Sequence, residues 1–156
     1  MRYKFLLTAG LALALFSSLH AQEKKFSRNS NWSTLAKISY KTIQDPYGPM
    51  SVPEFNEAVK AMEGEEIELS GYIIPLDGLE GAFQPTHFIL SSLPLSACFF
   101  CGSGGPESVV EVQLEDAIEY TTDPITLRGK LKLNGRDPYQ MIYILQDAEF
   151  VEVVGS

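Results

Sequence analysis

Apolar and polar residues alternate along most of the second half of the chain. A period of two is typical of a strand with one buried face, and a short continuous apolar run is typical of a fully buried strand. Segments of these two kinds cover residues 65–76, 86–92, 108–114, 124–134 and 140–154. The first and fourth carry a central glycine, where a strand can bend around a corner. The pattern predicts a mainly β (α+β) fold, a small five-stranded barrel of the oligonucleotide/oligosaccharide-binding (OB) type. An open antiparallel sandwich is the alternative.

Before these strands the apolar residues recur at other spacings. The segment from Trp32 to Tyr40 is typical of a short helix or of an arm packed by Trp32. Further on, Ser51 and Glu54 have the spacing of a capping box, and apolar residues follow at helical spacing as far as Gly64. This predicts a helix over 52–62, so that a short N-terminal helical segment precedes the barrel.

The first residues have the layout of a secretory signal peptide. Arg2 and Lys4 form a short basic start, and Ala21 suits the position before cleavage. The apolar run between them, from Phe5 to Phe16, is shorter than the roughly 20 residues that span a bilayer. We therefore expect a periplasmic or secreted protein without stable membrane insertion of the mature chain. Its expected parts are a signal peptide (1–21), a flexible arm (22–50) and a single OB-like domain (51–156).

The charge balance narrows the range of partners. The 156 residues carry 20 acidic and 12 basic side chains, a formal net charge of −8. Cleavage after Ala21 removes two basic residues and no acidic one, which lowers the net charge to −10. Nucleic acids are excluded as partners, because neutralising phosphates requires clustered Lys and Arg.

The stretch "SACFFCGSGGPES", residues 96–108, holds both cysteines of the chain, Cys98 and Cys101. Three interpretations stay open. The pair forms half of a metal site, since two thiolates at this spacing bind one ion and the following glycine lets the backbone curl around it. The pair forms a short disulfide in an oxidising compartment. The pair forms a redox centre, although glycines follow Cys101 where such a centre has a helix.

A closed metal site needs further ligands beyond the two thiolates. His87, at the start of a predicted strand, and Glu107, after the glycine-rich turn, are the candidates we select, and Asp77 is a further one. Zinc or copper is the expected ion.

The residues show no nucleophile elbow and no Ser/His/Asp arrangement, so we expect a binding protein in preference to an enzyme. The remaining alternative is an OB-type ligand-binding module with a structural disulfide and a groove lined by Tyr72, Tyr139 and Tyr143.

Three stretches together resemble a known family. "ELSGYIIPLD", "THFILSSLPLSACFFCGSGGPESVVEV" and "ITLRGKLKLN" are similar to secreted bacterial proteins grouped as domain of unknown function 3299. The resemblance runs from about Trp32 to the C-terminus and is most specific over 87–112. The version with both Cys98 and Cys101 is similar to the form found in Bacteroidetes. The resemblance implies a periplasmic protein of no established activity. Because it also implies that some members are encoded beside transport permeases, a membrane transport permease, with metal ions as the expected cargo, is the expected partner.

Overall fold

The computed structural model describes residues 30–75 and 83–155. The predicted signal peptide, its cleavage position and Asp77 lie outside these ranges. The elements are α1 (Ser30–Leu35), β1 (Ile38–Asp45), β2 (Gly48–Phe55), α2 (Glu57–Lys60), β3 (Glu66–Ile74), β4 (His87–Ser91), the 3₁₀ helices η1 (Leu95–Ala97), η2 (Phe99–Cys101) and η3 (Pro106–Ser108), β5 (Val109–Leu114), β6 (Ile125–Leu133) and β7 (Tyr143–Val153). Within the described part of the chain, no helix is long and apolar enough to cross a bilayer.

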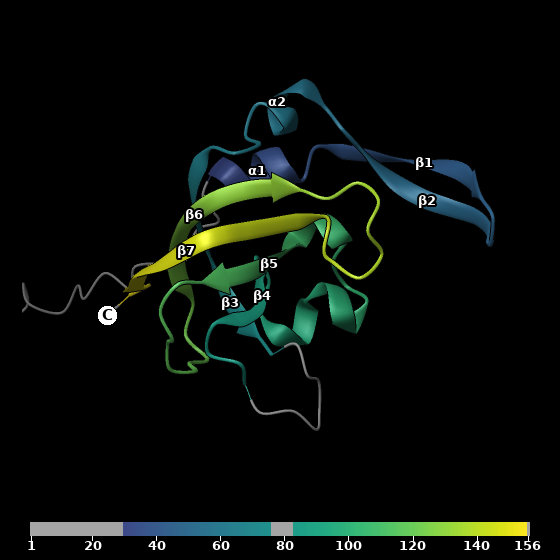
Figure 1. The fold of residues 1–156 in the computed structure, drawn as a ribbon. Helices are drawn as coiled ribbons and strands as arrows, with labels where there is room; N and C mark the ends of the chain where they lie inside the picture. The colour runs from purple at the N-terminus through teal and green to yellow at the C-terminus, as the bar shows by residue number, and fades with distance from the viewer. Residues whose placement is uncertain (1–29, 76–82, 156) are drawn as a thin grey trace, which may run out of the picture.

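Strands β3 to β7 form a closed barrel in the order β3-β4-β5-β7-β6, with β6 pairing back onto β3 (Figure 1). All neighbours are antiparallel except β5 and β7, which run parallel. The five strands occupy the five segments that alternation predicted. The predicted small OB-like barrel is thereby confirmed, and so is the short helix that precedes it.

The barrel interior is filled by alternate side chains of the strands. The largest buried ones include Leu69, Phe88, Leu90, Ile125, Leu127, Tyr143 and Leu145. Burying a side chain of this size contributes roughly 1.5–3 kcal/mol, which makes this cluster the main source of stability. Helix α1 closes one end: Trp32 is 3% exposed, and its indole Nε1–H donates to the carbonyl of Ser70 at 2.8 Å. Of the two interpretations left open for Trp32 to Tyr40, the short helix holds as far as Leu35, whereas residues 38–40 belong to β1.

The predicted helix over 52–62 is wrong for its first half. Residues 48–55 form strand β2, which pairs with β1 over eight residues in a hairpin that projects from the barrel (Figure 1). Pro53 fits there, because a two-stranded hairpin consists of edge strands, which tolerate a missing N–H. The helix begins only at Glu57, where the side chain of Asn56 accepts the N–H of Val59 at 2.9 Å. The part predicted as a flexible arm, 22–50, thus contributes α1, β1 and the first three residues of β2 within its described residues.

Two strands of the barrel, β3 and β6, lie unusually close to a neighbouring strand at a glycine. A Cβ on Gly71 of β3 would run into the carbonyl group of Ser91 and lie 3.1 Å from Leu90 Cγ. A Cβ on Gly129 of β6 would lie 2.9 Å from the carbonyl oxygen of Gln146 in β7. Both obstacles include backbone atoms, which cannot rotate away as a side chain can. Gly71 and Gly129, at which the sequence predicted bends, are therefore positions where the neighbouring strand leaves no room for a side chain.

We expect Gly71→Ala to lower the free energy of unfolding by about 1–3 kcal/mol, because the added methyl group overpacks a backbone crossing. Urea denaturation followed by tryptophan fluorescence measures this through Trp32. Gly135→Ala is the matched control, since a Cβ there meets only Phe55 at an ordinary 3.7 Å. Equal stability of the two variants would show that the crossing at Gly71 is not a constraint.

Candidate functional site

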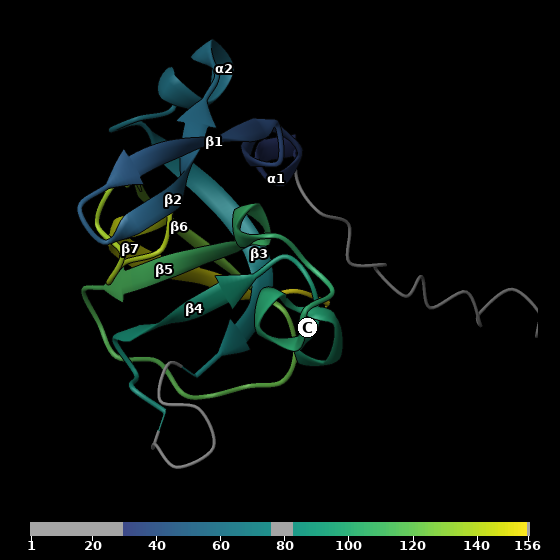
Figure 2. The same ribbon diagram turned by 90° about the vertical axis from the view of Figure 1, so that its right-hand side faces the viewer.

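The cysteines lie in the connection between β4 and β5, residues 92–108, which folds back over the outside of the barrel (Figure 2). Phe88 and Leu90 of β4 point inward, so Ile89 between them points outward, as Val109 of β5 also does. These two outward residues pack with Ile74 and with Cys98 in a second small apolar cluster. The connection is thus anchored on the β4–β5 face, where OB-type proteins commonly bind ligands.

A tight turn places the two cysteines side by side. The N–H of Cys101 donates to the carbonyl of Cys98 at 3.1 Å, and the N–H of Gly102 donates to Phe99 at 2.9 Å. Gly102 then has φ +78°, a left-handed conformation that glycine adopts without strain. The sequence "CFFCG" therefore forms a curled turn whose N–H groups bond to backbone carbonyls.

The two thiols are free and differ in depth. Cys98 is fully buried, whereas Cys101 is exposed and donates through Sγ to the carbonyl of Leu95 at 3.0 Å. The sulfur atoms are 3.9 Å apart. Two thiolates on one tetrahedral zinc ion, each about 2.3 Å from it, are separated by about 3.8 Å. The turn therefore holds the sulfurs at the spacing that one ion requires.

The electrostatic environment of Cys101 is unlike that of an attacking thiol. The hydrogen bond between the two thiols raises the pKa of Cys101 above its ordinary value, and partial desolvation and the charge of Cys98 act in the same direction. Exchange enzymes need the opposite, a lowered pKa that supplies thiolate at neutral pH. The direction of this shift argues against the redox alternative.

His87 lies on β4, one of the two strands that support the cysteine turn, but its side chain contacts Glu111 and not the cysteines. Its Nε2 is 2.9 Å from Oε1 of Glu111, whose side chain is 8% exposed against 42% for His87. The second carboxylate oxygen of Glu111 accepts the backbone N–H of Met141 at 3.1 Å. Glu111 thus joins β4, β5 and the β6–β7 connection. Sequence reasoning missed it, although a single charge within the apolar strand "VVEVQL" was the signal that could have found it.

Glu107, the other predicted ligand, lies at the base of the hairpin. Its carboxylate accepts the hydroxyl of Tyr40 at 3.1 Å, which links η3 to β1. Burial raises the pKa of Tyr40, and Glu107 adds to this effect. The four predicted residues therefore fall into three contacts: Cys98 with Cys101, His87 with Glu111, and Glu107 with Tyr40. Among residues 30–75 and 83–155, no three His, Cys, Asp or Glu side chains are grouped so as to hold a metal ion.

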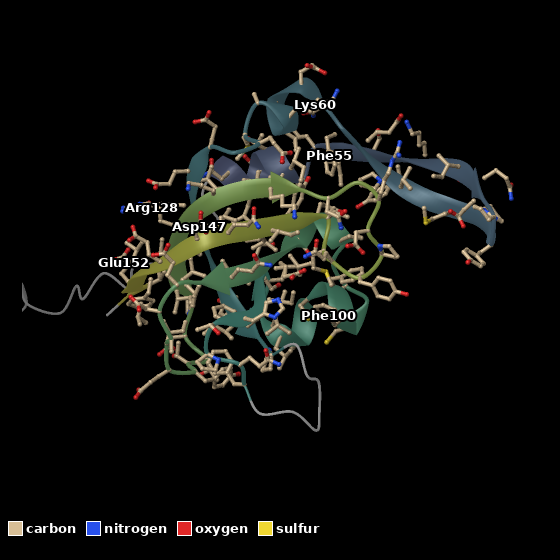
Figure 3. The ribbon with its side chains drawn as sticks, in the orientation of Figure 1. Phe55, Lys60, Phe100, Arg128, Asp147 and Glu152 are labelled. Carbon is tan, nitrogen blue, oxygen red and sulfur yellow. The ribbon has the colours of Figure 1, made fainter. Side chains whose placement is uncertain are left out.

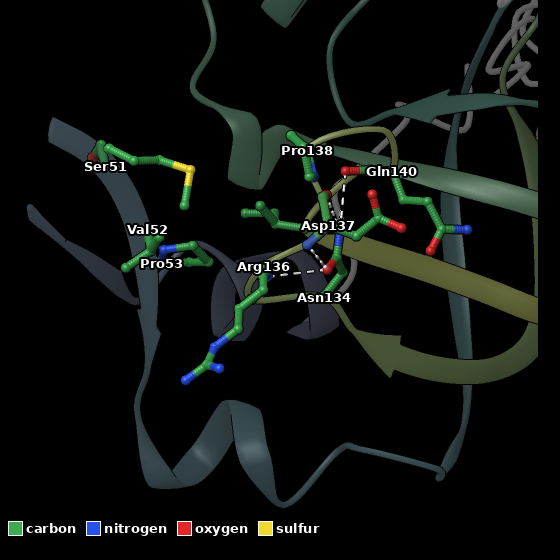
Figure 4. A pocket seen from close by; sticks show the side chains of 11 residues that line it. Ser51, Val52, Pro53, Asn134, Arg136, Asp137, Pro138 and Gln140 are labelled. Atoms are coloured by element: carbon green, nitrogen blue, oxygen red, sulfur yellow. Dashed lines mark hydrogen bonds between the residues drawn. The ribbon is translucent and has the colours of Figure 1, made fainter. Parts of the chain in front are cut away.

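A pocket of about 240 Å³ lies between the hairpin and the β6–β7 connection (Figure 4). Residues 50–53 of β2 form one wall and residues 134–138 form most of the other. The side-chain amide of Asn134 donates to Asp137 and Gln140, and its oxygen accepts two backbone N–H groups. These bonds hold the connection in shape.

Of the tyrosines predicted to line a groove, Tyr139 is exposed, but Tyr143 is buried and its hydroxyl donates to Leu35, so the prediction fails for Tyr143.

The sequence profile of the family described as "Protein of unknown function (DUF3299)" matches residues 17–150. This is most of the chain and includes the hairpin, the cysteine turn and the barrel as far as residue 150 in β7. The chain belongs to this family. No curated protein and no solved structure matches it. The resemblance to this family, inferred from the cysteine segment and the flanking strands, is thereby confirmed.

In the native DUF3299 protein we expect alkylation at Cys101 and protection of Cys98 until unfolding, since only Cys101 is exposed. Because the pKa of Cys101 is raised, the rate of its alkylation should keep increasing with pH beyond about 8.5, the ordinary pKa of a thiol. Mass spectrometry after timed exposure to iodoacetamide between pH 7 and 10 measures both effects, with urea-unfolded protein as the control. Reaction of Cys101 at pH 7 faster than in the unfolded chain would instead support the redox alternative.

Glu111→Ala should lower the free energy of unfolding by about 1–3 kcal/mol, because the N–H of Met141 loses its partner beneath the β6–β7 connection. Glu111→Gln retains an acceptor oxygen and should lose less. Chemical denaturation compares both with Glu115→Ala, an exposed position just beyond β5. If Glu111→Ala is as stable as that control, the carboxylate does not secure the connection.

Proposed function

We propose that this DUF3299 protein is a non-enzymatic periplasmic binding and accessory protein whose Cys98–Cys101 pair holds a thiophilic metal ion such as zinc or copper. The observation that carries the proposal is the 3.9 Å separation of two unbridged sulfur atoms in one turn. Thiolates are the ligands that zinc and cuprous copper favour in proteins. Binding releases the thiol protons, so the raised pKa of Cys101 lowers the affinity in acid without preventing binding at neutral pH.

The position of the turn supports the same function. It packs on the outer face of β4 and β5 through Ile89 and Val109, so the rigid barrel supports it from below. Cys98 contributes its sulfur from this packed side and Cys101 from the surface side, where an ion arrives. The hydrogen bond from Cys101 to Leu95 must break for the ion to bind, because the same sulfur then becomes a ligand.

The accessory role in transport belongs to this proposal as well. It rests on what the family resemblance implies, namely that some of these secreted proteins are encoded beside transport permeases. An ion held by two thiolates keeps coordination positions open for a second set of ligands. Such a site suits an ion that must be passed on.

Reduced wild-type protein should bind Zn²⁺ and Cu⁺ in competition with a chromogenic chelator. We expect Cys101→Ser and Cys98→Ala to weaken this binding by at least about a hundredfold, since each removes a direct ligand where loss of an outer partner alone costs 10–100-fold. The far-ultraviolet spectrum of each variant checks the fold, which matters most for the buried Cys98. Ser103→Ala, an exposed position in the same turn, is the matched control and should bind as wild type does.

Two results would contradict the proposal. Reduced wild-type protein that binds neither ion would remove the metal role altogether. Binding that survives in the Cys98→Ala/Cys101→Ser double variant would assign the ion to other residues, with the His87–Glu111 pair the first to test.

A further inference from the structure

The cysteine pair supplies only half of a closed metal site. A tetrahedral thiolate site has four ligands, and the turn contributes two. Within residues 30–75 and 83–155, no third His, Cys, Asp or Glu is grouped with the pair. His87 is held by Glu111 and Glu107 by Tyr40, so neither predicted ligand completes the set as the chain is folded. If the proposed function holds, the missing ligands are supplied from outside residues 30–75 and 83–155.

The segment that carries the pair differs from the rest of the sequence in charge. Residues 92–106, which we call the uncharged cap, contain no Asp, Glu, Lys or Arg, although the whole chain carries 20 acidic and 12 basic residues. The cap also exposes large apolar side chains beside Cys101: Leu95 is 53% exposed and Phe100 is 51% exposed. Figure 3 shows Phe100 at the cap, on the opposite side of the barrel from the charged Arg128 and Asp147.

We propose that a second copy of this chain docks on the uncharged cap and that the two copies share one zinc ion through four thiolates. This inference rests on the proposed metal binding by Cys98 and Cys101. A two-fold axis through the ion brings the same turn from each copy, so two ligands from each close a Cys₄ tetrahedron. The four thiols lose their protons to solvent as the ion binds.

Electrostatics favours a second copy over a basic partner. Two copies of the mature chain, each with a net charge of −10 after loss of the two basic residues before Ala21, repel each other wherever acidic surfaces meet. The cap is a face on which they approach without placing like charges opposite one another. Leu95 and Phe100 of each copy then bury apolar surface around the metal, as the uncharged centre of a protein interface does. A basic partner would instead be recognised by acidic groups, which the cap lacks.

The test is the mass and zinc content of the reduced full mature chain, measured together by light scattering and metal analysis. We expect a monomer without zinc and a dimer with one ion per two chains at half an equivalent of Zn²⁺, reversed by a chelator. Phe100→Glu places an acid at the centre of the interface and should raise the dimer Kd about tenfold or more. Tyr47→Glu is the matched control, because Tyr47 is fully exposed at the tip of the hairpin, and its Kd should stay within about twofold of wild type.

The outcomes separate this inference from the function on which it rests. A monomer that binds one zinc ion per chain would overturn the shared site and leave the proposed function standing. Protein that binds no zinc would overturn the proposed function and the shared site together. A dimer that persists without zinc, or in Cys101→Ser, would show an interface that does not use the thiolates and would also overturn the inference.

Discussion

Closure of the barrel is the constraint on which the rest of the structure depends. It requires β3 and β6, more than fifty residues apart in sequence, to pair along six positions, and it requires β5 and β7 to run parallel. Both β3 and β6 pass their neighbours so closely that backbone atoms occupy the space of a Cβ at Gly71 and Gly129. Without these crossings the strands could not enclose one core, and the connection that carries the cysteines would lose its support.

The cysteine turn packs on the outward face of β4 and β5, whose inward face forms part of the barrel core. Each of β4 and β5 sends alternate residues into the core and the others outward, so two apolar clusters share one strand pair. The outer cluster holds Cys98, and the Glu111 carboxylate holds Met141 nearby on the same face. The depth difference between the two sulfurs follows from this arrangement, because the first cysteine of the turn faces the barrel and the second faces away.

Charge is distributed unevenly over the surface, and this separates the candidate site from the remainder. On the outside of β3, β6 and β7, Arg128 bonds to Glu68 at 2.7 Å and to Glu149 at 2.9 Å. Exposed pairs of this kind contribute little to stability, about 0–1 kcal/mol each, but they keep that side hydrated. The uncharged cap is the contrasting side. A polar, acidic protein with one neutral face is suited to meet a partner through that face.

Local patterning by itself determined the five barrel strands and the tight turn at "CFFCG". These follow from the period of alternation and from neighbouring residues, which act over a few positions. Tertiary structure decided the remainder. Ser51 to Phe55 became strand because pairing with β1 over eight residues outweighs a local capping motif. Likewise, Glu111 joined His87, and Glu107 joined Tyr40, because strand register and packing bring together residues that are far apart in sequence.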